Sequence, residues 1–139
     1  MYIIGRIKLT LTGVKPSKWQ ENLLKEALKE SLLFINSKYE IDVTNLVTLR
    51  LSTPCRFAKY IHGKGIIRID LQNSNVNLYK LKTLGEYSTF IKTGYKISYI
   101  CQLIHELTHL IQDLDNRKYS EVETTKNEVE YLRMKKVIV

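Results

Sequence analysis

Two histidines four positions apart, with a glutamate next to the first, are the residues of this sequence best suited to chemistry. His105, Glu106 and His109 belong to the segment HELTH, which is an HExxH pattern. In an α-helix this spacing is slightly more than one turn, so both imidazoles lie on one face and can bind a single Zn²⁺. The carboxylate of Glu106 would accept a proton from the metal-bound water as that water attacks a carbonyl group, and deliver it to the leaving amine.

The residues around this pattern predict that it lies on a buried helix over 95–115. Two apolar stripes follow the segment at helical spacing: Ile97, Ile100, Ile104, Thr108 and Ile111 form one, and Leu103, Leu107, Leu110 and Leu114 form the other. Both histidines lie in the polar stripe between them, and buried polar side chains need partners. Because two of the chain's three histidines fall in this stripe, a metal site is favoured over an accidental pair of core histidines.

A catalytic zinc usually has three protein ligands and one water, so a third ligand is needed. No histidine follows the motif, but a further helix is predicted from a capping box at Ser120 and Glu123, and it contains Asn127 and Glu128. Here the sequence resembles the gluzincin peptidases, in which a second helix supplies a glutamate ligand, commonly within an Asn-Glu pair. The resemblance implies Glu128 as the third ligand, at the HExxH-x18-E spacing of the gluzincin aminopeptidases.

Glu130 is the competing carboxylate on this last helix. Two positions along a helix correspond to a rotation of about 200°, so only one of Glu128 and Glu130 can face the metal. Glu130 shares its side with Arg133 and is expected to form a solvated ion pair. Glu128 shares its side with the apolar Leu132, which makes it the preferred ligand.

Peptide hydrolysis also needs a donor to the developing oxyanion, often a tyrosine, histidine or arginine. Tyr119, just before the last predicted helix, is the best-placed candidate for this catalytic role, although packing is the commoner role of a loop tyrosine. Arg117 and His62 are weaker candidates. Asp113, Asp115 or a backbone carbonyl is expected to hold the outer imidazole nitrogens, as metal-binding histidines require.

The first part of the chain must supply the elements that position these helices. Apolar and polar residues alternate from Ile3 to Leu11 and from Ile41 to Leu51, which predicts two half-buried strands. Between them, a capping box at Ser17 opens an amphipathic helix that is predicted to reach Asn36.

A hairpin is predicted next, from strands 57–61 and 66–71 around the segment HGKG, with a positive φ at Gly63 or Gly65. The strand 66–71 is either an ordinary hairpin strand or the sheet edge along which zincin-like enzymes align an extended peptide. Residues 77–91 predict only a short helix and a loop.

These elements predict one α+β domain over residues 1–139, with an N-terminal helix, a small mixed sheet of about four strands, an active-site helix and a C-terminal glutamate helix. A chain of 139 residues suits a single core. The resemblance implies a zincin-like version of this architecture, similar to the compact stand-alone HExxH proteins of microbes and their viruses.

The composition limits where such a protein acts. No segment approaches the roughly 20 apolar residues of a membrane helix, the N-terminal segment does not resemble a secretory signal, and two cysteines are too few for a disulfide framework. A cytoplasmic location, in the producing or host cell, is therefore expected, with no membrane contact. The net charge of +8 predicts weak, salt-sensitive contact with nucleic acid.

The function predicted from these patterns is that of a zinc metallopeptidase with one Zn²⁺ per chain, acting on a peptide or protein substrate. The main alternative is a basic nucleic-acid-associated protein with a structural or vestigial metal site. A further alternative is an inactive metal-binding scaffold that works through contact with a partner.

Overall fold

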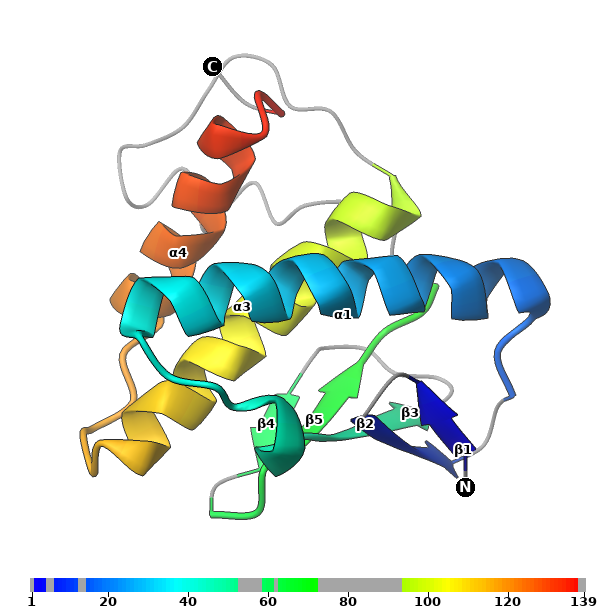
Figure 1. Cartoon of the computed structure of the whole chain (residues 1–139), viewed down its shortest axis with the longest axis horizontal. Helices are drawn as coiled ribbons and strands as arrows, with labels where there is room; N and C mark the ends of the chain where they lie inside the picture. Colours follow the sequence, from blue (N-terminus) through cyan, green and yellow to red (C-terminus); the bar gives the residue numbers. More distant parts are fainter. Residues whose placement is uncertain are drawn as a thin grey trace.

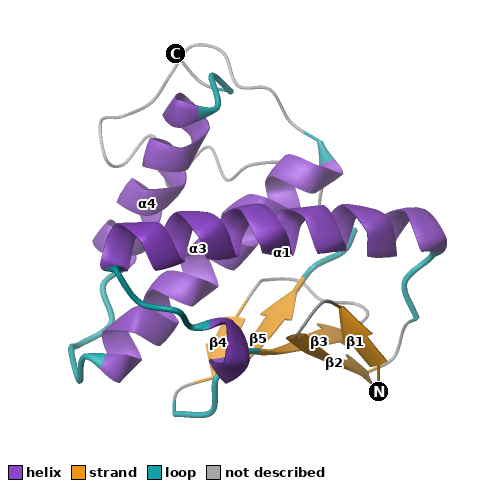
Figure 2. Cartoon of the chain, in the orientation of Figure 1, coloured by secondary structure: helices purple, strands orange, loops and turns teal. Residues whose placement is uncertain are grey.

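The computed structural model describes residues 2–4, 7–12, 15–52, 59–61, 63–72 and 94–137. In chain order its elements are β1 (Tyr2–Ile4), β2 (Ile7–Thr12), helix α1 (Lys18–Tyr39), the 3-10 turn η1 (Thr44–Leu46), β3 (Thr48–Ser52), β4 (Lys59–Ile61), β5 (Ile66–Ile69), and helices α3 (Tyr95–Leu114) and α4 (Glu121–Met134). This confirms an α+β chain in which helices accompany a small mixed sheet (Figures 1 and 2).

The strand order is β1-β2-β3-β5-β4, with β2, β3 and β5 parallel and with β1 and β4 antiparallel to their neighbours. The single strand predicted from Ile3 to Leu11 is wrong, because β1 and β2 fold back on each other with Ile4 opposite Ile7. The period-two pattern continues across both strands, and so it does not reveal the reversal between them.

The strand predicted from Ile41 to Leu51 is also shorter than expected. Residues 44–46 form η1, and the strand starts only at Thr48. Val43 and Val47 are buried although they precede the strand, so alternating apolar residues here mark burial and not an extended backbone.

The predicted hairpin is confirmed, since β4 and β5 pair antiparallel with Ile61 opposite Ile66. Both glycines of its turn have a positive φ, 74° at Gly63 and 62° at Gly65. A Cβ on Gly65 would lie 2.1 Å from the carbonyl oxygen of Leu46, so this position requires glycine. The segment considered as a possible sheet edge, 66–71, is not an edge: β5 lies between β3 and β4. The segment 77–91 lies outside the described residues.

The helices pack on one side of the sheet and enclose the core (Figure 1). α1 begins with the predicted capping box, in which Ser17 and Gln20 exchange both hydrogen bonds, and it continues past Asn36 to Tyr39. α3 is buried along most of its length between α1, α4 and the sheet. Within the described residues, no helix is both long and apolar enough to cross a membrane.

Candidate metal centre

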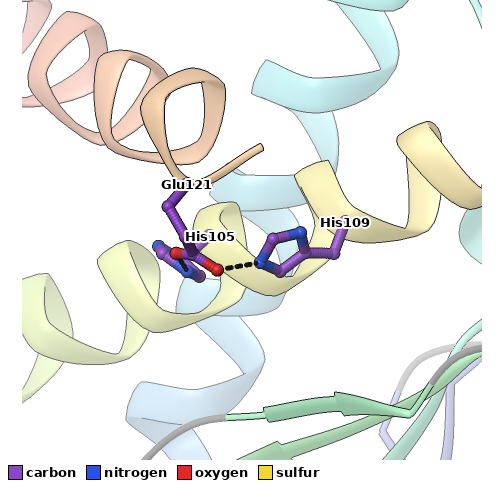
Figure 3. A group of neighbouring side chains, drawn as sticks. All are labelled: His105, His109 and Glu121. Atoms are coloured by element: carbon purple, nitrogen blue, oxygen red, sulfur yellow. Dashed lines mark hydrogen bonds and ion pairs between the residues drawn. The ribbon is translucent and has the colours of Figure 1, made fainter. Parts of the chain in front are cut away.

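Helix α3 holds His105 and His109 on a buried face, with their ring centroids 5.1 Å apart. The Nε2 atoms of both rings meet one carboxylate, that of Glu121: His105 Nε2 lies 2.8 Å from Oε2 and His109 Nε2 lies 2.9 Å from Oε1 (Figure 3). The three side chains offer ligand atoms that all lie within 4.8 Å of one another. They form a group that can bind one metal ion.

Glu121 reaches this position because it is the first residue of α4, directly after the N-cap Ser120. A carboxylate in the first turn of a helix is favoured by the helix dipole. The side chain of Glu121 is 64% exposed, whereas both imidazoles are buried. Of the three side chains, Glu121 therefore reaches solvent, while the two imidazoles do not.

The second ring nitrogen of each imidazole, Nδ1, also has a polar partner. His105 Nδ1 lies 2.8 Å from Oε2 of Glu128, and His109 Nδ1 lies 2.9 Å from Oε1 of Gln112. A ring that donates its Nδ1–H to such an acceptor keeps the Nε2 lone pair for a metal. This two-sided arrangement is what metal-binding histidines need.

Glu128, which the sequence predicted as the third ligand, also lies beside His105. It contacts the Nδ1 of His105, on the opposite side of the ring from Glu121. Seven residues of helix are nearly two full turns, so Glu121 and Glu128 share one face of α4 and are separated by a rise of about 10.5 Å. Glu130 lies on the exposed side, where it forms the expected solvated ion pair, with Lys38 at 2.7 Å.

A second carboxylate, Glu123, holds the connection between α3 and α4. Its Oε1 accepts hydrogen bonds from Gln112 Nε2 at 2.8 Å and Arg117 Nη1 at 2.9 Å, and its Oε2 accepts one from the Tyr39 hydroxyl at 2.7 Å. Burial by itself would raise the pKa of Glu123, but these three donors lower it below its usual value. Since Gln112 also contacts His109, this network fixes both the end of α3 and the start of α4.

The lowered pKa of Glu123 predicts a pH-dependent loss of stability on Glu123→Gln. The group binds its proton less readily when folded, so its carboxylate stabilises the fold above the ordinary pKa of 4.5 and loses that effect as the pH falls through the lower folded value. The substitution should lower the free energy of unfolding by about 1 kcal/mol at pH 7, and by much less near pH 3. Urea unfolding at both pH values measures this. Glu130→Gln, at an exposed ion pair, is the control, and an equal loss at both pH values would contradict the assignment.

The aspartates considered as partners of the imidazoles have other contacts. Asp113 Oδ2 accepts hydrogen bonds from the Tyr60 hydroxyl at 2.7 Å and from the Gly63 amide at 2.8 Å. Asp115 pairs with Arg117 at 3.3 Å. Asp113 therefore ties the edge strand β4 and the hairpin turn to the end of α3.

The two residues predicted to act on substrate lie beside the three-residue group. Glu106 is buried, and its Oε1 lies 3.9 Å from His105 Nε2, the nitrogen that also faces Glu121. The ring of Tyr119 stacks on that of His109 with centroids 4.6 Å apart. Burial, followed by the charges of Asp113 and Glu106, raises the pKa of Tyr119 to about 12, so its hydroxyl keeps its proton at neutral pH. Of the weaker donor candidates, Arg117 is engaged with carboxylates and His62 lies outside the described residues.

Comparison with known proteins finds no relative: no family model, no curated protein and no solved structure matches this chain. The likeness to gluzincins therefore depends on the motif alone. The chemistry that the site can perform follows from its donor atoms, which are two imidazole nitrogens and a carboxylate.

Proposed function

We propose that this chain is a zincin-like zinc metallopeptidase, with His105, His109 and Glu121 as the ligands of one Zn²⁺. The observation that carries the proposal is that both Nε2 atoms contact the carboxylate of Glu121, while each Nδ1 atom contacts another side chain, Glu128 or Gln112. Two imidazoles and a carboxylate are a donor set of known catalytic zinc sites. Because Glu121 is largely exposed, a water and a substrate would approach the metal from its side.

The surrounding side chains support a hydrolytic role. A zinc ion held here would polarise a carbonyl group and make bound water acidic. Glu106, next to the metal-facing nitrogen of His105, would accept the proton of the attacking water and pass it to the leaving amine. Tyr119, still protonated at neutral pH, would donate a hydrogen bond to the oxygen that becomes negatively charged in the transition state.

The edge strand β4 supports the zincin-like part of the proposal, because it lies beside α3. Among the described strands, β4 ends the sheet on the side of α3, and it packs against that helix. Tyr60 of β4 donates to Asp113 of α3, and its ring lies 6.1 Å from that of Tyr119. An extended peptide paired with β4, and not with 66–71, would pass close to the metal group.

The proposal is tested by metal content together with cleavage of a proteome-derived peptide library. We expect about one zinc per chain, and cleavage that 1,10-phenanthroline stops and added zinc restores. His109→Ala is the control that should lose both. Failure to bind zinc, even when zinc is supplied, would overturn the proposal. Stoichiometric zinc without any cleavage would indicate a metal-binding scaffold instead.

A further inference from the structure

The face of the sheet that points away from the helices carries a line of positive charge. The core face is formed by alternate residues of the strands, among them the buried Leu49, Leu51, Ile67 and Ile69. The residues between them point the other way, and the long helices α1, α3 and α4 all lie on the core side (Figure 1). Within the described part of the chain, none of these helices covers the outer face.

Three cations share one row across this outer face. Arg50 of β3 pairs in register with Arg68 of β5, and Arg68 pairs in register with Lys59 of β4. Neighbouring strands are about 4.8 Å apart, so the row extends over about 10 Å. We define the basic row as Lys59, Arg68 and Arg50.

The charges of the basic row are not compensated by the described residues. The strands β3, β4 and β5 contain no aspartate or glutamate, and no ion pair joins the row to a described acid. Like charges directly opposite each other on adjacent strands destabilise a sheet. In addition, the buried Nε atoms of Arg50 and Arg68 have no hydrogen-bond partner. An anion on the outer nitrogens would relieve the repulsion.

From this geometry we propose that the basic row is a docking surface for the phosphodiester backbone of nucleic acid. A line of cations on a sheet face that none of the described helices covers complements a line of regularly spaced phosphates, and the planar arginine guanidinium matches phosphate oxygens. The net charge of +8 attracts such a polyanion from a distance. None of the residues of β3, β4 and β5 on this face is aromatic, so the row recognises backbone and does not stack on bases. This surface is separate from the metal group and does not depend on the peptidase activity.

Fluorescence anisotropy with a labelled 30-base-pair DNA duplex, titrated from 50 to 200 mM salt, tests the proposal. The variant Lys59→Gln, Arg50→Gln, Arg68→Gln is expected to bind at least about ten-fold more weakly at 100 mM salt, and its slope of log K against log salt should fall by about 2 to 3. The control variant is Lys18→Gln, Lys29→Gln, Lys126→Gln, which removes the same charge from exposed positions on α1 and α4. It should weaken binding less than about three-fold.

These outcomes distinguish binding by the basic row from binding caused by the net positive charge of the whole protein. Equal weakening in both triple variants, or no binding by the unchanged protein at 50 mM salt, overturns the proposal. Binding to vesicles with anionic lipids, lost on changing the basic row, without DNA binding would make the partner a membrane and also overturns it. Because the half-buried Arg50 and Arg68 contribute to the sheet, Lys59→Glu at an exposed position is tested alongside, and it should weaken DNA binding about three-fold or more with an unchanged melting curve.

Discussion

Glu106→Gln is expected to lower kcat/KM for peptide cleavage by about 10²- to 10⁴-fold while the zinc content stays at about one per chain. The amide has almost the shape of the carboxylate, so it fits the same buried position, but it cannot accept the proton of the attacking water. The carboxylate of Glu106 lies 3.9 Å from the Nε2 of His105, beside the metal group and not within the three-residue ligand set. The substitution should therefore separate catalysis from metal binding.

The matched control is Glu130→Gln, which removes a carboxylate from the exposed side of the glutamate helix, where its partner is Lys38. Cleavage rates should not change in this variant. If Glu106→Gln retained activity within a factor of two, Glu106 would not be the general base. If it lost zinc as well, Glu106 would be a ligand and the assignment of Glu121 would need revision.

Glu121→Gln and Glu128→Gln are expected to weaken zinc binding to different degrees. Glu121 faces both Nε2 atoms and would be lost as a direct ligand, so zinc affinity should fall by more than about 100-fold. Glu128 orients His105 through its Nδ1, and loss of such an outer partner typically costs about 10- to 100-fold. Competition with a chromophoric zinc chelator measures both affinities. If Glu128→Gln reduced zinc affinity more than Glu121→Gln, Glu128 would be a direct ligand of the metal, as the sequence predicted.

The helix that carries both histidines could be predicted from the sequence because its pattern depends only on local geometry. The HELTH segment and its apolar stripes require one buried helix with both imidazoles on one face, and α3 has that form. The capping-box patterns at Ser17 and Ser120 likewise predicted where α1 and α4 begin, because a cap is made by residues within one turn of each other. The box forms at Ser17, whereas Ser120 caps only the Glu123 amide and the Glu123 carboxylate accepts from Gln112 and Arg117 instead.

The residue that we propose as the third ligand, Glu121, could not be chosen from the sequence in the same way. Glu121 and Glu128 are separated by seven residues and lie on one helical face, so rotation about the axis excludes Glu130 but does not distinguish between them. The two glutamates differ in their position along α3, which depends on where α4 lies against that helix. The connection between the helices, with its contacts among Gln112, Arg117 and Glu123, determines this position. The sequence contained one signal that could have raised Glu121 as a candidate: a carboxylate at the start of a helix that follows the motif closely.

The strands, too, could be predicted from the sequence only in part. In the second predicted strand, alternation marks the buried residues Val43, Val47, Leu49 and Leu51, although Ile41 is 40% exposed. Alternation carries no information about chain reversal, so the first predicted strand is in fact the pair β1 and β2. The parallel pairing of β2 with β3 and of β3 with β5 joins distant parts of the chain, and it depends on how α1 and the hairpin return the backbone to the sheet.

The three proposed ligands differ in their exposure to solvent, and this difference predicts how fast a bound metal would exchange. Both imidazoles belong to a helix that is buried in the core, while Glu121 is 64% exposed at the first turn of α4. An ion bound at the proposed site would enter and leave past this carboxylate, and moving the carboxylate requires only the end of one helix to open, which costs far less than global unfolding. The rate of metal release should therefore follow the fraying of α4, and stabilising the first turn of that helix would lengthen the residence time of the ion without changing the core.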